Sequence, residues 1–424
     1  LMVLTLEKEK TLLVDGPARV HILSGKTSVL GALVEAGKEI VVRKGKRMPF
    51  EALQGSKIEL VLGDSASYAE VEGSSIPPSW REAASEILAQ KGSKTILVMG
   101  GVDSGKTSFS TYLANLALNS RYKVALIDGD PGQSEIGPPG AISLGLVKNP
   151  SVDLFRLDAE GLVFIGVTSP SRKTREILDA LRGVKKEALQ KGENFLIINT
   201  DGWVEGEGAL SYKIRLVEAA APDIVVAIQS GDELAPILSE LANIRVFVVE
   251  SPRDIKRRDR ETRKLLRESA YKKYLRQAKL RSFPLSWVQI DGDLRLDTEN
   301  ESSLRTRIEQ TIGGRVLYCE ETPDCILLLL GGENSLNQEE IARLESEFGK
   351  RVTGLHLGEE EGLLVALEDA QRKVLGIGTI RDIDYERRTM KVYTPVEQAV
   401  SRIHVGCIKL DSEGNEIGWI LENF

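Results

Sequence analysis

One stretch of the sequence has the residue types and spacing of a loop that binds phosphate. Residues 100–107 read Gly-Gly-Val-Asp-Ser-Gly-Lys-Thr and fit G-x-x-x-x-G-K-S/T at every position. An apolar run precedes this loop and a helical pattern follows it, so a strand–loop–helix phosphate site is favoured over an ordinary glycine-rich turn. Lys106 is expected to bridge the β- and γ-phosphates and Thr107 to bind Mg²⁺. The candidate nucleotide-binding residues are Gly100, Gly101, Val102, Asp103, Ser104, Gly105, Lys106, Thr107 and Ser108.

Two carboxylates stand at the end of the next apolar run, in Asp128-Gly-Asp130-Pro-Gly-Gln133. Beside a triphosphate, one of them can order a metal ion or accept a proton from an attacking hydroxyl. The alternative is that they only solvate a strand end. A GTPase is disfavoured, because residue 129 is Gly where an Asp would be expected and the Asn-Lys-x-Asp guanine motif is absent.

Two further apolar runs end in unusual polar residues. One is followed by Thr168-Ser169-Pro170, and the other by Asn199-Thr-Asp-Gly-Trp203. Stacking a nucleic-acid base on Trp203 would contribute about 1–3 kcal/mol. The alternative is a partly buried tryptophan that packs on its own domain.

The segment 252–281 is strongly basic. It holds thirteen Lys and Arg residues against four acids, a net charge of +9, which leaves −16 for the rest of the chain. Arg260, Arg263 and Arg267 share one helical face at spacings of three and four. A guanidinium that reaches the γ-phosphate could stabilise phosphoryl transfer, and the neighbouring cations could hold a polyanion. A solvated charged helix is the alternative.

Length and composition set the wider limits. The 424 residues predict two or three domains, with 42% hydrophobic and 28% charged residues. A net charge of −7 argues against a chain coated with basic charge. Three cysteines and three scattered histidines suggest neither a disulfide framework nor a metal site. We expect no signal peptide and no membrane span, and a cytoplasmic location, or a nuclear one in a eukaryote.

The elements that must position these residues predict an α/β fold. Apolar runs at 95–99, 124–127, 162–165, 195–198, 224–228 and 246–249 alternate with helical stretches, which indicates a mostly parallel sheet in a central P-loop domain. Ligands bind at the carboxyl ends of such strands. The predicted domains are an N-terminal β-domain (1–76), the P-loop domain (77–310, with a basic lid at 252–281) and a C-terminal β-rich domain (311–424). A capping box at Ser79 and Glu82 and a helix at 337–348 are also expected.

Taken in order, these motifs resemble one family, the polynucleotide 5′-hydroxyl kinases. It includes the RNA kinase of pre-mRNA 3′-end cleavage and tRNA splicing and the ribosomal-RNA-processing kinase. The resemblance covers about residues 95–275. It implies transfer of the ATP γ-phosphate to the 5′-OH end of RNA, and whether DNA is also a substrate stays open. It also implies RNA-processing proteins as further partners. The oligomeric state stays open.

The resemblance also implies residue roles. Asp130 would be the general base and Lys106 would bind the transferring phosphoryl group. Thr107 would hold Mg²⁺ with help from Gln133 or Asp128. The remaining candidates are the substrate-binding residues Gln133, Thr168, Ser169, Pro170, Trp203 and Arg260, and the lid arginines Arg263 and Arg267. One departure is Glu205, which stands where many relatives carry Lys.

Two other functions remain open. One is a non-catalytic, ATP-binding scaffold of an RNA-processing complex, and the other is a kinase for small molecules. Intact Lys106, Thr107 and Asp130 favour catalysis, while Trp203 and the basic segment favour a polymeric substrate.

Overall fold

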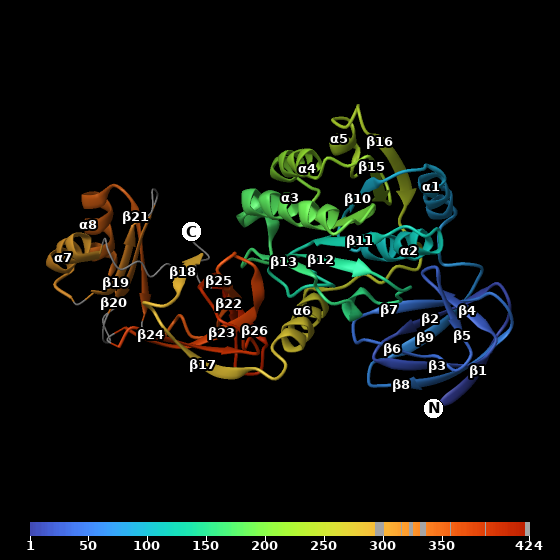
Figure 1. Cartoon of the computed structure of the whole chain (residues 1–424), viewed down its shortest axis with the longest axis horizontal. Helices are drawn as coiled ribbons and strands as arrows, with labels where there is room; N and C mark the ends of the chain where they lie inside the picture. Colours follow the sequence, from blue (N-terminus) through green and yellow to red (C-terminus); the bar gives the residue numbers. More distant parts are fainter. Residues whose placement is uncertain are drawn as a thin grey trace. The chain divides into compact units, whose positions relative to one another are not determined.

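The computed structural model describes residues 1–292, 301–314, 316–321, 325–330, 336–356, 358–385 and 387–419. The chain divides into two compact units, Leu1–Ala270 and Tyr271–Phe424 (Figure 1). The first unit contains every candidate site residue. In the part of the chain that the structure describes, no helix is both long and apolar enough to span a membrane.

The first unit begins with a β-domain of two sheets. Their strand orders are β1-β8-β3-β6 and β5-β4-β7-β2-β9. The strands are β1 (Met2–Leu6), β2 (Lys10–Asp15), β3 (Ala18–Ser24), β4 (Lys26–Val29), β5 (Ala32–Glu35), β6 (Glu39–Val42), β7 (Arg47–Ala52), β8 (Ser56–Leu62) and β9 (Ser67–Glu72). Val20, Ile22, Ile58 and Leu60 are fully buried in its core. Buried and less buried positions alternate along β3 and β8, so these side chains share the inner face of the sheet.

The central sheet has the order β13-β12-β11-β14-β10-β15-β16. Its strands are β10 (Lys94–Gly100), β11 (Val124–Gly129), β12 (Ala141–Val147), β13 (Gly161–Phe164), β14 (Phe195–Thr200), β15 (Ile224–Gln229) and β16 (Arg245–Glu250). The six predicted strands are all present and the P-loop fold is confirmed. β12 was not predicted from the sequence, and it pairs antiparallel with β11 and with β13. Because β10 lies between β14 and β15, the phosphate loop leaves the middle of the sheet.

Five helices accompany this sheet, in places that the helical periodicity predicted. They are α1 (Pro78–Ala89), α2 (Lys106–Asn119), α3 (Thr174–Gln190), α4 (Glu207–Ala220) and α5 (Ala235–Leu238). α3 packs against α4, and α1 packs against α2 (Figure 1). The rings of Trp80 in α1 and Phe109 in α2 meet edge to face. The predicted capping box at Ser79 is wrong: α1 begins at Pro78, and the Ser79 hydroxyl instead accepts a hydrogen bond from the backbone N–H of Glu250.

The predicted lid contains more than one element. Residues 251–259 form an irregular segment after β16, and α6 (Arg260–Tyr274) follows it. The end of the predicted lid is β17 (Lys279–Pro284), which pairs with a strand of the second unit.

The second unit is rich in strands, as predicted. One sheet has the order β17-β24-β23-β22-β25-β18, with β26 paired to β25, and a smaller sheet has the order β19-β20-β21. The strands after β17 are β18 (Gln289–Gly292), β19 (Val316–Glu321), β20 (Cys325–Leu330), β21 (Arg351–His356), β22 (Leu363–Glu368), β23 (Val374–Asp384), β24 (Thr389–Thr394), β25 (Arg402–Leu410) and β26 (Glu416–Trp419). The helices are α7 (Glu301–Ile312) and α8 (Gln338–Phe348), and Asn337 caps α8. β17 and β18 join this sheet although they precede the predicted boundary at 310.

Candidate active site

A cavity of about 1530 Å³ opens at the carboxyl edge of the central sheet. Residues that follow the strands on both sides of β10 line this cavity, because ligands of parallel sheets bind at the carboxyl ends of the strands. The predicted site residues that line it are Gly101, Val102, Asp103, Ser104, Gly105, Lys106, Thr107, Ser108, Asp130, Gln133, Thr168, Ser169, Pro170, Trp203, Arg263 and Arg267. Gly100, Asp128 and Arg260 are not among the lining residues.

The phosphate loop has the backbone that its glycines permit. Gly105 adopts a φ of 102° directly before α2, a conformation that L side chains rarely adopt. A Cβ at Gly100 would lie 2.5 Å from the carbonyl oxygen of Ile228, so only glycine fits there. The Lys106 ammonium donates to the carbonyl oxygens of Gly100 (2.9 Å) and Gly101 (2.6 Å). Burial lowers the pKa of Lys106 to about 8, and Asp130 partly opposes this shift.

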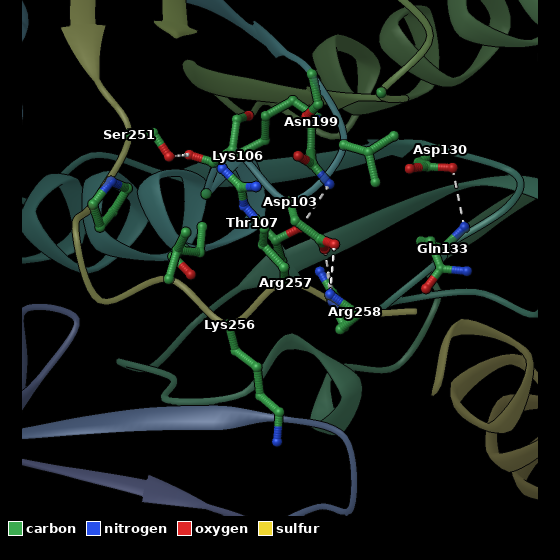
Figure 2. A pocket seen from close by; sticks show the side chains of 18 of the residues that line it. Asp103, Lys106, Thr107, Asp130, Gln133, Asn199, Ser251, Lys256, Arg257 and Arg258 are labelled. Atoms are coloured by element: carbon green, nitrogen blue, oxygen red, sulfur yellow. Dashed lines mark hydrogen bonds and ion pairs between the residues drawn. The ribbon is translucent and has the colours of Figure 1, made fainter. Parts of the chain in front are cut away.

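A cluster of oxygen atoms lies at the start of α2. The Asn199 amide donates to the Thr107 hydroxyl at 3.4 Å (Figure 2). It also donates to the Asp128 carboxylate at 3.3 Å, and Asn199 Oδ1 is buried without a hydrogen-bond partner. The Asp128 carboxylate also accepts from the backbone N–H of Glu135 (2.6 Å). Burial raises the pKa of Asp128 to about 7. A hydroxyl, a carboxylate and an unsatisfied amide oxygen are ligands that Mg²⁺ prefers, so the residues fit this ion.

The sequence analysis did not assign a role to Asn199. Asn199 stands at the end of the buried strand β14, and a polar residue at this position was the sequence feature that could have indicated a role in the site. Gln133, proposed as a metal-binding or substrate-binding residue, lines the cavity and donates through its amide to the carbonyl oxygen of Gly132 (2.7 Å).

Asp130 lies on the other side of the cavity. Its Oδ1 accepts from the backbone N–H groups of Gly132 (2.9 Å) and Gln133 (3.0 Å), which fix the carboxylate (Figure 2). Burial raises the pKa of Asp130, and the charge of Asp201 adds to this shift. Since the side chain lines the cavity, Oδ2 can accept a proton from a hydroxyl bound there.

Trp203 lies at the same edge and is half-buried. Its ring stacks on Tyr212, with centroids 5.6 Å apart and an interplanar angle of 24°. Its backbone N–H donates to Asp201, which also accepts from Tyr212 (2.9 Å) and pairs with the buried Lys213 (2.9 Å). Trp203 therefore packs on its own domain and also lines the cavity. Asp201 and Lys213 were not predicted as site residues.

The lid segment passes over the phosphate loop. Arg258 donates to both carboxylate oxygens of Asp103 at 2.8 Å, through its backbone N–H and its Nε, and the Ser251 hydroxyl donates to the carbonyl oxygen of Ser104 (3.0 Å) (Figure 2). Arg263 and Arg267 were the predicted lid arginines, and a role for Arg258 was not predicted. Six basic lid residues line the cavity: Arg253, Lys256, Arg257, Arg258, Arg263 and Arg267.

The fold and this cavity define a P-loop protein whose site has the residues that a phosphotransferase uses. A family model described as mRNA cleavage and polyadenylation factor CLP1 P-loop matches residues 100–277. The polyribonucleotide 5′-hydroxyl-kinase MJ1315 of Methanocaldococcus jannaschii is 30% identical, over 81% of this chain and 94% of that protein. The corresponding kinase of Pyrococcus abyssi is 28% identical over 81% and 95%. The chain thus belongs to the family of polynucleotide 5′-hydroxyl kinases and CLP1 proteins.

The fold agrees with this assignment. The solved structure of the wild-type Clp1p–Pcf11p complex matches with a TM-score of 0.68 and 13% identity, covering 96% of this chain and 97% of that one. A CLP1 homologue of Nematostella vectensis is 24% identical over 92% of this chain and 90% of that protein. The resemblance drawn from the motifs is therefore confirmed.

Proposed function

We propose that the protein is an ATP-dependent polynucleotide 5′-hydroxyl kinase that transfers the γ-phosphate of ATP to the 5′-OH end of RNA. One observation carries this proposal: Lys106, Asp130 and the lid arginines Arg263 and Arg267 line a single cavity above a complete phosphate loop. Phosphoryl transfer needs a cradle for the phosphates, a proton acceptor and cations at the transferring group, and this cavity offers all three.

The chain's residues divide the reaction between them. Backbone N–H groups of the phosphate loop and the amino end of α2 bind the phosphates of ATP. Asp130 accepts the proton of the 5′-OH as that oxygen attacks the γ-phosphorus, and ADP leaves. Lys106 exchanges its two carbonyl partners for phosphate oxygens, and Arg263 and Arg267 neutralise the charge that develops on the transferred group.

Mg²⁺ would be held by Thr107 and Asn199, with Asp128 beside them, and would neutralise negative charge on the β- and γ-phosphates. Asp128 would have a second task, because its carboxylate accepts hydrogen bonds from the Ser134 hydroxyl and from the backbone N–H groups of Glu135 and Ile136. These bonds would shape the loop that presents Asp130. The side chains of Thr168 and Ser169 and the ring of Trp203 would then hold the first nucleotides of the substrate.

The adenosine part of ATP is expected to extend toward the N-terminal β-domain. Leu13, Leu30, Pro49 and Ile76 give this wall of the cavity apolar surface, beside the cations Lys46 and Arg47. Flat aromatic bases bind well against such surfaces.

The alternative of an ATP-binding scaffold is favoured by one observation. Lys106 and Arg258 donate hydrogen bonds to groups of the protein itself, Lys106 to the loop carbonyls and Arg258 to Asp103, so both cations have partners without a phosphate. Clp1p was solved in complex with Pcf11p, so RNA-processing protein partners are proposed for this chain as well. A cytoplasmic location, or a nuclear one in a eukaryote, completes the proposal.

The test compares substrates in one assay. The full-length protein is incubated with γ-labelled ATP and Mg²⁺ and with a 5′-OH RNA, the same sequence as DNA, a 5′-phosphorylated RNA and free nucleosides. We expect label on the 5′-OH RNA, none on the 5′-phosphorylated strand and little on nucleosides. Labelling of the DNA strand shows whether the protein also phosphorylates DNA. Tight ATP binding with no labelled product would support the scaffold, while labelled nucleosides alone would indicate a small-molecule kinase.

A further inference from the structure

The loop between β6 and β7 of the N-terminal β-domain contacts the active site on two sides. Residues 43–46 and the first residue of β7, Arg47, read Arg-Lys-Gly-Lys-Arg, and together they are called the brace loop. The β-domain itself anchors this loop, because the backbone N–H of Gly16 donates to the carbonyl oxygen of Lys46 (2.9 Å) and Gly16 forms a β-bridge with Lys44.

On one side the brace loop holds the segment that carries Asp130. Arg43 donates to Glu135 (2.9 Å) and to Asp153 (2.8 Å), and Lys46 forms a second ion pair with Glu135. Glu135 is buried, and its backbone N–H is one of the donors to Asp128. The brace loop therefore fixes a residue of the same short loop that presents Asp130.

On the other side the brace loop holds the lid. Arg47 pairs with Asp15 (2.8 Å) and donates to the carbonyl oxygen of Asp254 (2.9 Å). The side chain of Lys256 extends from the lid toward the β-domain (Figure 2). It pairs with the same Asp15 at 3.4 Å. The lid backbone and a lid side chain are thus both tied to the β-domain.

The backbone of the brace loop also packs directly on α6. Gly45 has a φ of +80°, and a Cβ at this position would lie 2.9 Å from Thr262 Cγ2 and 3.5 Å from Leu266. Thr262 and Leu266 are the neighbours in sequence of Arg263 and Arg267, which line the cavity. A displacement of α6 by a side chain at residue 45 would move both arginines.

We propose that the brace loop is a positioning element for phosphoryl transfer, which sets the place of the lid arginines relative to Asp130. The inference rests on the proposed function, which supplies the reaction that these groups serve. Buried ion pairs add little net stability, because desolvation offsets most of their attraction, but they fix relative positions well. A displacement of about 1 Å in such a site can lower the rate about 100-fold.

The first test uses two glycines of the β-domain. Gly45→Ala places a Cβ against α6, whereas Gly37→Ala, at a φ of +85°, places one in open space. Both variants put an L residue at positive φ, so they share the backbone strain and differ in the contact with α6. We expect Gly45→Ala to lower kcat for RNA phosphorylation about 10- to 100-fold with the KM for ATP changed less than about threefold, and Gly37→Ala to retain the wild-type kcat.

The second measurement does not depend on activity. Hydrogen exchange of the full-length wild type and both variants is followed in peptides covering 128–136 and 251–267. We expect faster exchange there in Gly45→Ala only. Equal kcat and equal exchange in the two variants would overturn the proposal, as would faster exchange throughout the β-domain in Gly45→Ala, which would indicate simple destabilisation. If the wild type phosphorylates no 5′-OH strand, the proposed function fails, and the exchange comparison still decides the role of the brace loop.

Discussion

At the scale of single residues, the active site is built from side chains whose charges burial disfavours. Burial shifts the pKa of Lys106 downward and that of Asp130 upward, so each is moved toward its neutral form. Each group also favours the charged form of the other, since Asp130 raises the pKa of Lys106 and Lys106 lowers the pKa of Asp130. Residues whose pKa values are shifted by burial and by a neighbouring charge are typical of catalytic sites.

The lowered pKa of Lys106 predicts a pH dependence of ATP binding. In the free protein Lys106 is protonated below a pH of about 8 and loses its proton above it. The phosphates of ATP stabilise the protonated form, so affinity is full below pH 8 and declines as the pH rises through 8, by up to about tenfold per pH unit. Titration calorimetry at pH 7 and pH 9 should show weaker binding and proton uptake at the higher pH. An affinity that is flat from pH 7 to 9 would contradict this assignment.

Trp203 offers a second prediction at this scale. Trp203→Ala should raise the KM for RNA by about 5- to 100-fold, because it removes a stacking surface worth about 1–3 kcal/mol, and should leave the KM for ATP nearly unchanged. Trp203→Phe retains a ring against Tyr212 and is the control, with a smaller loss expected. Steady-state kinetics with each substrate varied in turn provide the measurement. Equal increases in both KM values would indicate a purely structural tryptophan.

The sequence was informative about residues whose chemistry is fixed by local spacing. The phosphate loop, Asp130 and Trp203 each stand at a strand end, and the structure brings them to one cavity. Asn199 and Arg258 were not assigned, because their roles depend on contacts with Thr107 and Asp103 that are distant in sequence. Such pairings follow from the fold and leave no periodic signal in the chain.

At the scale of elements, the junction of β14 and α4 supports the side of the cavity that Trp203 lines. Asp201 follows β14, and α4 provides Tyr212 and Lys213, which bond to this carboxylate. Lys213 is fully buried and Asp201 nearly so. Removing one partner leaves an uncompensated buried charge, which costs more than the intact pair contributes.

This junction predicts a large loss of stability. Lys213→Met removes the cation with little change in volume, and should lower the free energy of unfolding by about 3–5 kcal/mol. Lys186→Met, at an exposed position of α3, is the matched control and should change it by less than about 0.5 kcal/mol. Urea unfolding followed by circular dichroism provides the comparison. Similar stabilities for the two variants would show that Asp201 does not depend on Lys213.

Element boundaries were less predictable than element types. The sequence analysis missed β12, because its short apolar run, Ala-Ile-Ser-Leu-Gly-Leu-Val, contains two residues with low strand propensity. β17 lies in a basic stretch without alternation, so its pairing with β24 could not be foreseen from the pattern. The expected lid, 252–281, therefore ends inside a strand of the second unit.

At the scale of the whole molecule, the net charge of −7 averages regions of opposite sign. Residues 252–270 of the first unit carry eight basic and four acidic residues, a net charge of +4, while 271–281 carry five basic residues and no acid. The six cavity-lining lid cations all belong to the first group. This distribution suits a protein that binds one end of a strand.

The charge distribution predicts a selective dependence on salt. RNA affinity should fall with ionic strength, and Arg253→Gln with Arg257→Gln, both at the cavity, should reduce the slope of log KM against log salt by about 1.4. The control is Lys272→Gln with Lys273→Gln, which removes the same charge from the second unit and should leave the slope nearly unchanged. Equal slopes for the two double variants would show that the cavity cations do not contact RNA.

The central claim, that this cavity transfers a phosphoryl group to a 5′-hydroxyl with Asp130 as the base, is tested most directly by Asp130→Asn. Asparagine keeps an oxygen that can accept from the N–H groups of Gly132 and Gln133, but it cannot take up a proton in the reaction. ATP affinity and single-turnover transfer to a 5′-OH RNA are measured on the same preparations of wild type and variant. The variant should bind ATP within about threefold of wild type and transfer phosphate about 10²- to 10⁴-fold more slowly. Undiminished transfer by Asp130→Asn, or no transfer by the wild type, would contradict the account.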